Sequence, residues 1–204
     1  MGVRGLYSYV TGQDALWRPL RSSERPVLVV DAGSFKYELC RVFFFGSRHG
    51  GDLFRLRHAT SELFARLQSW GWEVVFVFDG AQPEWKADTS VQRAEEDIAR
   101  ADRDMRGVGE WEDRLPPMLA GSVLRTCLRD AGVECMTADF EADGAACAVA
   151  RDRDGMVVSS DSDLMVMPSP GYIDMPQFFE FACGREDNLQ VLEPERLWKH
   201  FRLT

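Results

Sequence analysis

The sequence predicts an α/β domain with a mostly parallel central sheet flanked by helices. Short apolar runs at 27–30, 74–78 and 156–158 alternate with segments whose apolar residues recur at helical spacing. Such continuous apolar strands, separated by helices, indicate parallel pairing through right-handed crossovers. The first two runs lead directly into an aspartate, and Asp161 and Asp163 follow the third shortly after its end, which places several acids at the carboxyl edge of the sheet, where ligands of such folds gather.

Length and composition indicate one compact domain spanning 1–204. The chain has 204 residues, of which 45% are hydrophobic, enough for one sizeable core. Its five cysteines are scattered and without Cys-x-x-Cys spacing, which predicts reduced thiols in an intracellular monomer. No apolar run is long enough to cross a membrane. The net charge of −9 disfavours nucleic acid as a partner, but assigning six carboxylates to one metal site leaves only −3.

Two helices are expected between the first two strands. Ser34 can cap a helix that runs to about Phe45, and the glycines after His49 interrupt it. Asp52 then begins a second helix, which Gly71 ends. The apolar residues of this second helix are predicted to be core: Leu53, Leu56, Leu63, Phe64, Leu67 and Trp70.

A charged segment at about 81–117 interrupts the pattern. One interpretation is a solvated or partly disordered insertion, and the other is an arch-like insertion that carries function. The second interpretation rests on Lys86 and Arg93, which are seven residues apart and therefore share one helical face, shortly after Asp79. Such residues could bind a phosphate group near the strand-end acids.

The second half of the chain is expected to contain three helices and one further strand besides 156–158. The three helices cover 118–131, 141–153 and 193–203, and the strand covers 133–137. Gly132 and Gly155 are the expected helix stops, and Pro194 suits the first turn of the last helix. The prolines between Met167 and Gln177 predict irregular structure there.

Two pairs of carboxylates bracket the alanine-rich helix and the strand that follows it. Glu141 and Asp143 lie in the first turn of the helix, where its dipole favours negative charge, and Asp161 and Asp163 follow the strand. Acids this close repel one another unless a cation lies among them. Oxygen ligands alone select a hard ion, Mg²⁺ or Mn²⁺.

Two other interpretations of these acids remain open. A Glu-x-Asp at a helix start can simply cap the helix. An Asp-x-Asp after a strand also occurs in phosphatases with an aspartyl nucleophile and in metal-dependent sugar transferases. The phosphatase motif requires an apolar strand up to its first aspartate, whereas Ser159 and Ser160 precede Asp161. The presence of both pairs favours the metal site.

The order of these motifs resembles the flap-endonuclease-like branch of the PIN-like nucleases, and most closely the asteroid proteins. The matching segments are MGVRGL, VVDAG, VFVFDG, FEADGAACA and SSDSDL, which span nearly the whole chain. The resemblance implies a PIN-like three-layer domain. HGGD after the first helix and the serine pair in SSDSD are the features most similar to asteroid proteins.

The resemblance also assigns roles by position. The metal ligands that it implies are Asp31, Asp79, Glu141, Asp143, Asp161 and Asp163, with Asp143 in place of the usual glutamate. The substrate-binding residues are Gly2, Arg4, Lys86 and Arg93. In the family, a backbone amine at the position of Gly2 lies near the active site, and the basic pair contacts the scissile phosphate. These acids, Lys86 and Arg93 are therefore the expected catalytic residues.

These features predict a metal-dependent, structure-selective endo- or exonuclease. It would hydrolyse phosphodiester bonds of DNA, or of RNA, with two Mg²⁺ or Mn²⁺ ions about 3.5–4 Å apart. DNA is the favoured partner, in a role such as DNA repair, and the expected compartment is nuclear in a eukaryote and cytoplasmic otherwise. The alternative is a catalytically weak, nuclease-like interaction scaffold in RNA regulation or DNA repair. Retention of all six acids favours the enzyme, because a scaffold has no physical need for a self-repelling cluster.

Overall fold

A seven-stranded sheet runs through the part of the chain that the computed structural model describes, residues 5–21, 24, 26–108 and 114–202. The strands are β1 (Trp17–Pro19), β2 (Leu28–Asp31), β3 (Val74–Phe78), β4 (Glu134–Thr137), β5 (Met156–Ser159), β6 (Tyr172–Asp174) and β7 (Gln190–Leu192). Their order is β1-β7-β6-β5-β2-β3-β4. The pairs from β6 to β4 are parallel, and β7 and β1 add antiparallel strands at one edge. The prediction of a mostly parallel sheet is confirmed.

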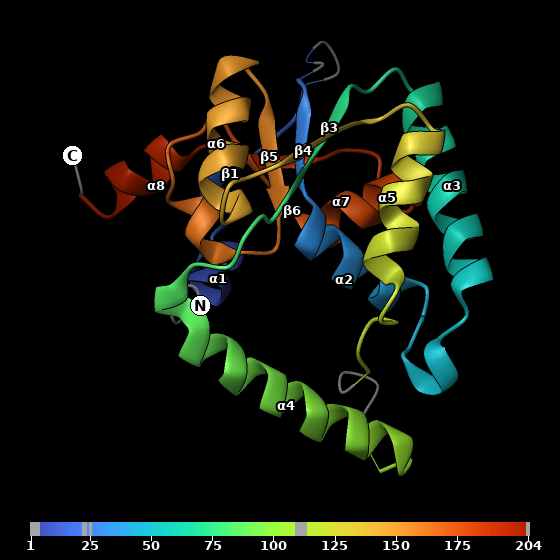
Figure 1. Cartoon of the computed structure of the whole chain (residues 1–204). Helices are drawn as coiled ribbons and strands as arrows, with labels where there is room; N and C mark the ends of the chain where they lie inside the picture. Colours follow the sequence, from blue (N-terminus) through green and yellow to red (C-terminus); the bar gives the residue numbers. More distant parts are fainter. Residues whose placement is uncertain (1–4, 22–23, 25, 109–113, 203–204) are drawn as a thin grey trace.

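Helices cover both faces of this sheet (Figure 1). The α-helices are α1 (Leu6–Thr11), α2 (Ala32–Val42), α3 (Leu53–Ser69), α4 (Ala87–Met105), α5 (Ala120–Asp130), α6 (Ala142–Asp152), α7 (Met175–Ala182) and α8 (Pro194–His200). One core cluster joins the sheet to α2, α3, α5 and α7, and a second joins the other face to α1, α6 and α8. The three-layer α/β fold is therefore confirmed. Among the described residues, no helix is both long and apolar enough to cross a membrane.

The central strands carry apolar side chains on both faces. Val29 and Val157 belong to one core cluster, while Val30 and Val158, their neighbours in sequence, belong to the other. All four are completely buried. Successive side chains of a strand point to opposite faces, so a sheet covered on both sides needs continuous apolar strands. This is why the sequence shows uninterrupted apolar runs instead of alternation.

Helix α2 begins earlier than predicted. It lies between β2 and η2, which is a short 3₁₀ turn (Arg48–Gly50). Asp31 caps α2, because its carboxylate accepts hydrogen bonds from the backbone N–H groups of Gly33 and Ser34. The prediction that Ser34 is the cap is wrong, since Ser34 already lies inside the helix. Asp52 caps α3 as expected. Trp70, expected in the core, directly follows α3 and is 36% exposed.

The region after Met167 was predicted to be irregular, and this is wrong. It contains β6, α7 and β7, and α7 accepts Pro176 in its first turn. Gly155 is not the left-handed residue after α6; Asp154 is, with φ of 49°. Gly155 is needed for another reason, because a Cβ there would lie 2.6 Å from the carbonyl oxygen of Val27.

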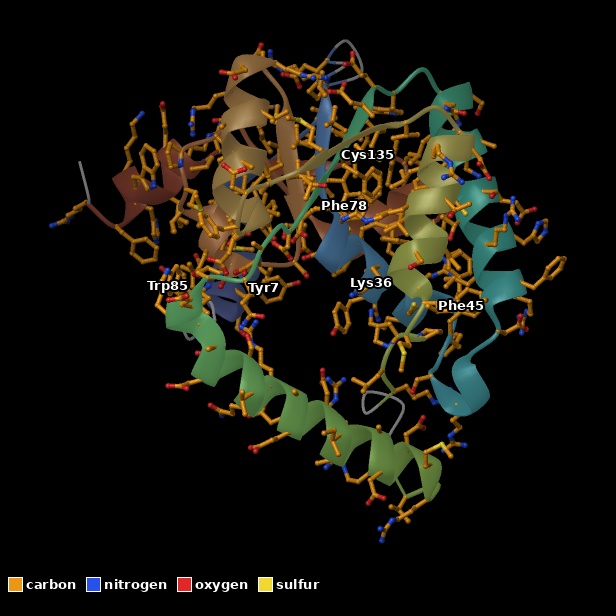
Figure 2. All side chains as sticks on the ribbon, in the orientation of Figure 1. Tyr7, Lys36, Phe45, Phe78, Trp85 and Cys135 are labelled. Atoms are coloured by element: carbon orange, nitrogen blue, oxygen red, sulfur yellow. The ribbon has the colours of Figure 1, made fainter. Side chains whose placement is uncertain are left out.

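The charged segment forms a long, solvated helix. It begins after η3 (Glu84–Lys86), whose Trp85 is labelled in Figure 2, and α4 then runs apart from the other helices. Of the nineteen described residues of α4, only Asp104 is buried. Arg48 donates to Asp104 Oδ1 at 3.1 Å and also to the carbonyl oxygen of Asp104, and Arg114 Nε lies 3.9 Å from Oδ1. The far end of α4 is thus anchored by charge and not by apolar packing.

Replacing Arg48 with alanine is expected to loosen the carboxyl end of α4. The buried Asp104 carboxylate would lose its main partner, and removing one partner of a buried ion pair costs about 3–5 kcal/mol, less here because Arg114 remains. Amide hydrogen exchange should therefore accelerate in the last turns of α4 and stay unchanged in β2 and β3. Arg106→Ala is the matched control, because Arg106 pairs with the exposed Asp102 on the same helix. Equal exchange in both variants would contradict the anchoring role.

Candidate metal centre

The carboxylate of Asp31 is held rigidly at the carboxyl end of β2. Its Oδ1 accepts the backbone N–H groups of Gly33 at 2.9 Å and Ser34 at 3.3 Å. Its Oδ2 accepts the hydroxyl groups of Ser34 at 2.6 Å and Ser159 at 2.8 Å. Asp31 is 91% buried, so these bonds replace much of its hydration.

Ser159 joins the ends of β2 and β5. Besides donating to Asp31, its hydroxyl oxygen accepts the backbone N–H of Asp161 at 3.0 Å. Asp161 in turn caps a short 3₁₀ turn, η5 (Ser162–Met165), by accepting the N–H of Asp163 at 2.9 Å. Sequence analysis did not assign Ser159 a role, although the serine pair before Asp161 was a visible signal.

Asp79 connects the end of β3 to the start of α6. Its Oδ1 accepts the backbone N–H of Ala142 at 2.8 Å, so a distant strand end caps this helix. The approach requires Gly80, where a Cβ would lie 1.8 Å from the carbonyl oxygen of Ala138. A Cβ at Gly33 would lie 3.2 Å from Asp31 Oδ1 and 3.9 Å from Asp79 Oδ2. The carboxylates of β2 and β3 therefore converge over Gly33.

Glu141 and Asp143 lie at the amino end of α6, as their spacing predicted. Glu141 is the residue before the helix and Asp143 lies in its first turn. Lys86, on the segment that leads into α4, forms an ion pair with Glu141 Oε1. The structure thus brings one residue of the predicted basic pair into direct contact with a predicted metal ligand.

Electrostatics tie five of the predicted acids together. The pKa of Asp143 is raised to about 6, first by burial and then by the negative charges around it. Those charges are Asp161, Asp31, Glu141 and Asp79, in decreasing order of effect. Asp143 therefore lies within the electrostatic influence of the acids at the ends of β2, β3 and β5 and at the start of α6.

The remaining predicted residues are placed differently. Asp163 follows two residues after Asp161 and lies in the first turn of η5. Arg93 is exposed on α4, where its charge acts on Tyr37 of α2; within the described residues no hydrogen bond or ion pair joins it to the acids. Gly2 and Arg4 lie outside the described residues.

The six carboxylates suit a hard divalent cation, although their side chains do not surround a single point. In the described ranges, no three Asp, Glu, His or Cys side chains stand close enough together to hold an ion as they are. The chemistry nevertheless fits Mg²⁺ or Mn²⁺, because all six proposed ligands offer carboxylate oxygens and neighbouring carboxylates raise the pKa of Asp143.

Sequence analysis missed two buried acids beside this centre. Asp174 ends β6 next to β5, and Glu38 lies on α2, where Arg41 pairs with it. Burial raises the pKa of Asp174 to about 6, and the charge of Glu38 adds to the effect. The run Tyr172–Asp174 repeats the pattern of apolar residues followed by an aspartate, but the surrounding prolines concealed a strand of three residues.

In fold, the chain is similar to the catalytic cores of flap-endonuclease-like nucleases, and the resemblance expected from the sequence is confirmed. No family model matches the chain. Protein asteroid of Drosophila melanogaster is 28% identical over 167 residues, which cover 81% of this chain and 19% of that protein.

Solved structures show the same fold. The catalytic core of Rad2 in complex with DNA substrate matches with TM-scores of 0.62 and 0.64 in two complexes, at 23% and 19% identity. Human GEN1 in complex with Holliday junction DNA matches with a TM-score of 0.59 at 15% identity. These matches cover 97–98% of this chain but 56% of the Rad2 core and 46% of GEN1. The chain thus spans about half of the structures and a fifth of the asteroid protein.

The raised pKa of Asp143 predicts how the free energy of unfolding of the metal-free protein depends on pH. With a pKa near 6, Asp143 keeps its proton in the folded state between about pH 4 and 6 while the unfolded chain loses it, so the metal-free fold loses stability as pH rises through this window. Asp143→Asn should remove about 1 kcal/mol of this loss, after allowance for its partial exposure. Urea unfolding with chelator between pH 4 and 7 measures it.

Asp152→Asn provides the control for this measurement. Asp152 is exposed at the other end of the same helix, so its stability curve should run parallel to that of the wild type. If the Asp143→Asn curve is also parallel, the carboxylates do not act on Asp143 as described.

Proposed function

We propose that this chain is a metal-dependent, structure-selective nuclease domain that hydrolyses phosphodiester bonds of DNA, or of RNA, by a two-metal mechanism. The observation that carries the proposal is that hydrogen bonds through Ser159 and Ala142 hold the acids after β2, β3 and β5 and the amino end of α6 together at one edge of the sheet. The charges of these acids also raise the pKa of Asp143. Asteroid-like sequence and a Rad2-like fold support it. Rad2 and GEN1 have been solved with DNA, which makes DNA the first substrate to test.

The proposed metal ligands are the six acids Asp31, Asp79, Glu141, Asp143, Asp161 and Asp163. When bound, Mg²⁺ or Mn²⁺ would supply an activated water and stabilise the departing oxygen. The chain's own contribution is orientation. Asp31 and Asp161 are fixed through Ser159, and Asp79 is fixed against α6, so hydrogen bonds set the positions of these carboxylates before a cation binds.

Lys86 and Arg93 are the proposed phosphate-binding residues. Lys86 contacts Glu141 in the structure, and a metal ion at Glu141 would compete for that carboxylate and free the ammonium for substrate. Arg93 lies about two helical turns beyond Lys86, on α4. We propose that 81–117 is an arch-like insertion within a single domain, with α4 holding Arg93 over the carboxyl edge of the sheet.

A catalytically weak interaction scaffold remains the second candidate. The observation that favours it is that the acids already have structural partners: Asp31, Asp79 and Asp161 cap helices or turns, and Glu141 is paired with Lys86. One assay separates the two candidates. Labelled flap, overhang, single-stranded and duplex DNA and RNA are incubated with Mg²⁺, Mn²⁺ or chelator, and a scaffold would bind without cleaving.

Asp161→Asn is expected to abolish cleavage without unfolding the domain. The amide oxygen can still accept the N–H of Asp163, so η5 should keep its cap, while the negative charge that a cation requires is lost. Cleavage should fall by at least about 100-fold, the scale of losing one well-placed electrostatic contact. Thermal unfolding in chelator should change little. Full turnover by a pure preparation would remove the nuclease proposal from this site.

Lys86→Ala and Arg93→Ala are expected to slow the chemical step more than they weaken binding. A contact that strengthens in the transition state lowers kcat when it is lost, by roughly tenfold for each 1.4 kcal/mol. Single-turnover rates and substrate affinity are measured separately. Arg129→Ala, at an exposed site on α5, is the control. Normal single-turnover rates with reduced affinity would make the pair positioning residues only.

A further inference from the structure

A cavity lies near the antiparallel edge of the sheet, outside the residues proposed as metal ligands. Its volume is about 420 Å³. It is lined by Thr11, Asp14, Trp17, Asp174, Gln177 and Gln190, which come from α1, η1 (Asp14–Leu16), β1, β6, α7 and β7. Thr11 and Asp14 are exposed and Asp174 is buried, so the cavity leads from the surface to a buried carboxylate.

The lining of this cavity is acidic and rich in hydrogen-bond acceptors. It contains two carboxylates, two carboxamides, a hydroxyl and an indole, and none of its described lining residues is lysine or arginine. Thr11 donates its hydroxyl proton to the carbonyl oxygen of Tyr7, which leaves its oxygen as an acceptor. An anionic ligand such as a nucleic-acid phosphate would be repelled here, and a cationic one attracted.

Asp174 provides an independent reason to expect a ligand. It is 91% buried, and its Oδ2 accepts the hydroxyl of Tyr7 at 3.2 Å. Its Oδ1 forms no hydrogen bond of normal geometry with the described residues, although the backbone N–H of Gln177 lies near enough to lower the pKa of the carboxyl. No described lysine or arginine is among the groups that shift this pKa, so a cation that entered the cavity would stabilise the buried negative charge.

A guanidinium group matches this lining better than an ammonium group. It is planar and can lie against an indole, and it offers five N–H donors to carboxylate and amide oxygens. We propose that the cavity binds an arginine side chain of a protein partner, with Asp174 and Asp14 as acceptors and Trp17 as the apolar wall. The cavity lies beside the proposed metal centre, because Asp174 pairs in register with Ser159 of β5, but none of the six proposed metal ligands lines it.

In the test, the full chain is titrated with a short capped peptide that contains one arginine. Binding is followed through the NMR chemical shifts of the protein. The arginine peptide should shift the signals of Trp17, Gln177 and Gln190 with a Kd of about 1 mM, as expected for a single side chain. The same peptide with citrulline, a neutral isostere, should bind at least tenfold more weakly. Equal binding of citrulline, or tighter binding of free spermidine than of the arginine peptide, overturns the proposal.

Two variants connect the binding to the named acids. Asp14 is exposed, so Asp14→Asn should weaken binding of the arginine peptide at least threefold without affecting folding. Asp174 is buried at the base of the cavity, and Asp174→Asn should weaken binding at least tenfold. Asp187→Asn is the control, an exposed acid outside the cavity, and should bind like the wild type. Should Asp174→Asn fail to fold, Asp14→Asn decides: unchanged affinity in that variant overturns the proposal.

Discussion

Repulsion between carboxylates crowded at one edge of the sheet is the constraint on which this structure depends. The fold offsets this repulsion with hydrogen bonds from backbone N–H groups to the carboxylates. Asp31 caps α2, Asp161 caps η5, and Asp79 accepts the first N–H of α6 from across the sheet. Helix amino ends carry partial positive charge, so each acid lies where negative charge is most tolerated. Capping and cation binding are therefore compatible uses of the same carboxylates, and the first prepares the geometry for the second.

The parts of the fold that could be predicted are those with strong local signals. The strands before Asp31 and Asp79 are apolar runs buried on both faces, and α3 carries a regular apolar stripe between a capping aspartate and a glycine. The acids at the strand ends were predictable for the same reason, because parallel strands end at one edge. The hydrogen bonds that hold these acids could not be predicted, since the one from the backbone N–H of Ala142 to Asp79 joins residues 63 positions apart.

The elements that escaped prediction are short or depend on distant contacts. Strands β6 and β7 have three residues each, and their burial comes from neighbouring strands. Asp154 takes the left-handed conformation expected of Gly155, because Gly155 must lie close to the backbone of Val27. The segment at 81–117 was predicted to be either a solvated or partly disordered insertion or an arch-like insertion, and the structure shows the helix α4 there. Its composition permits a solvated helix, and local pairs such as Gln92 with Glu96 support one.

The attachment of α4 at both ends fixes how long this helix can be. Lys86, the residue before α4, pairs with Glu141, and Asp104 near its other end meets Arg48. Each residue inserted between these contacts would move Asp104 about 1.5 Å along the helix axis and turn it by more than a quarter of a turn. Seven added residues would nearly restore its angle but displace it by about 10 Å, which would separate it from Arg48. The two ion pairs therefore act as a ruler for the length of a helix whose residues are otherwise largely solvated.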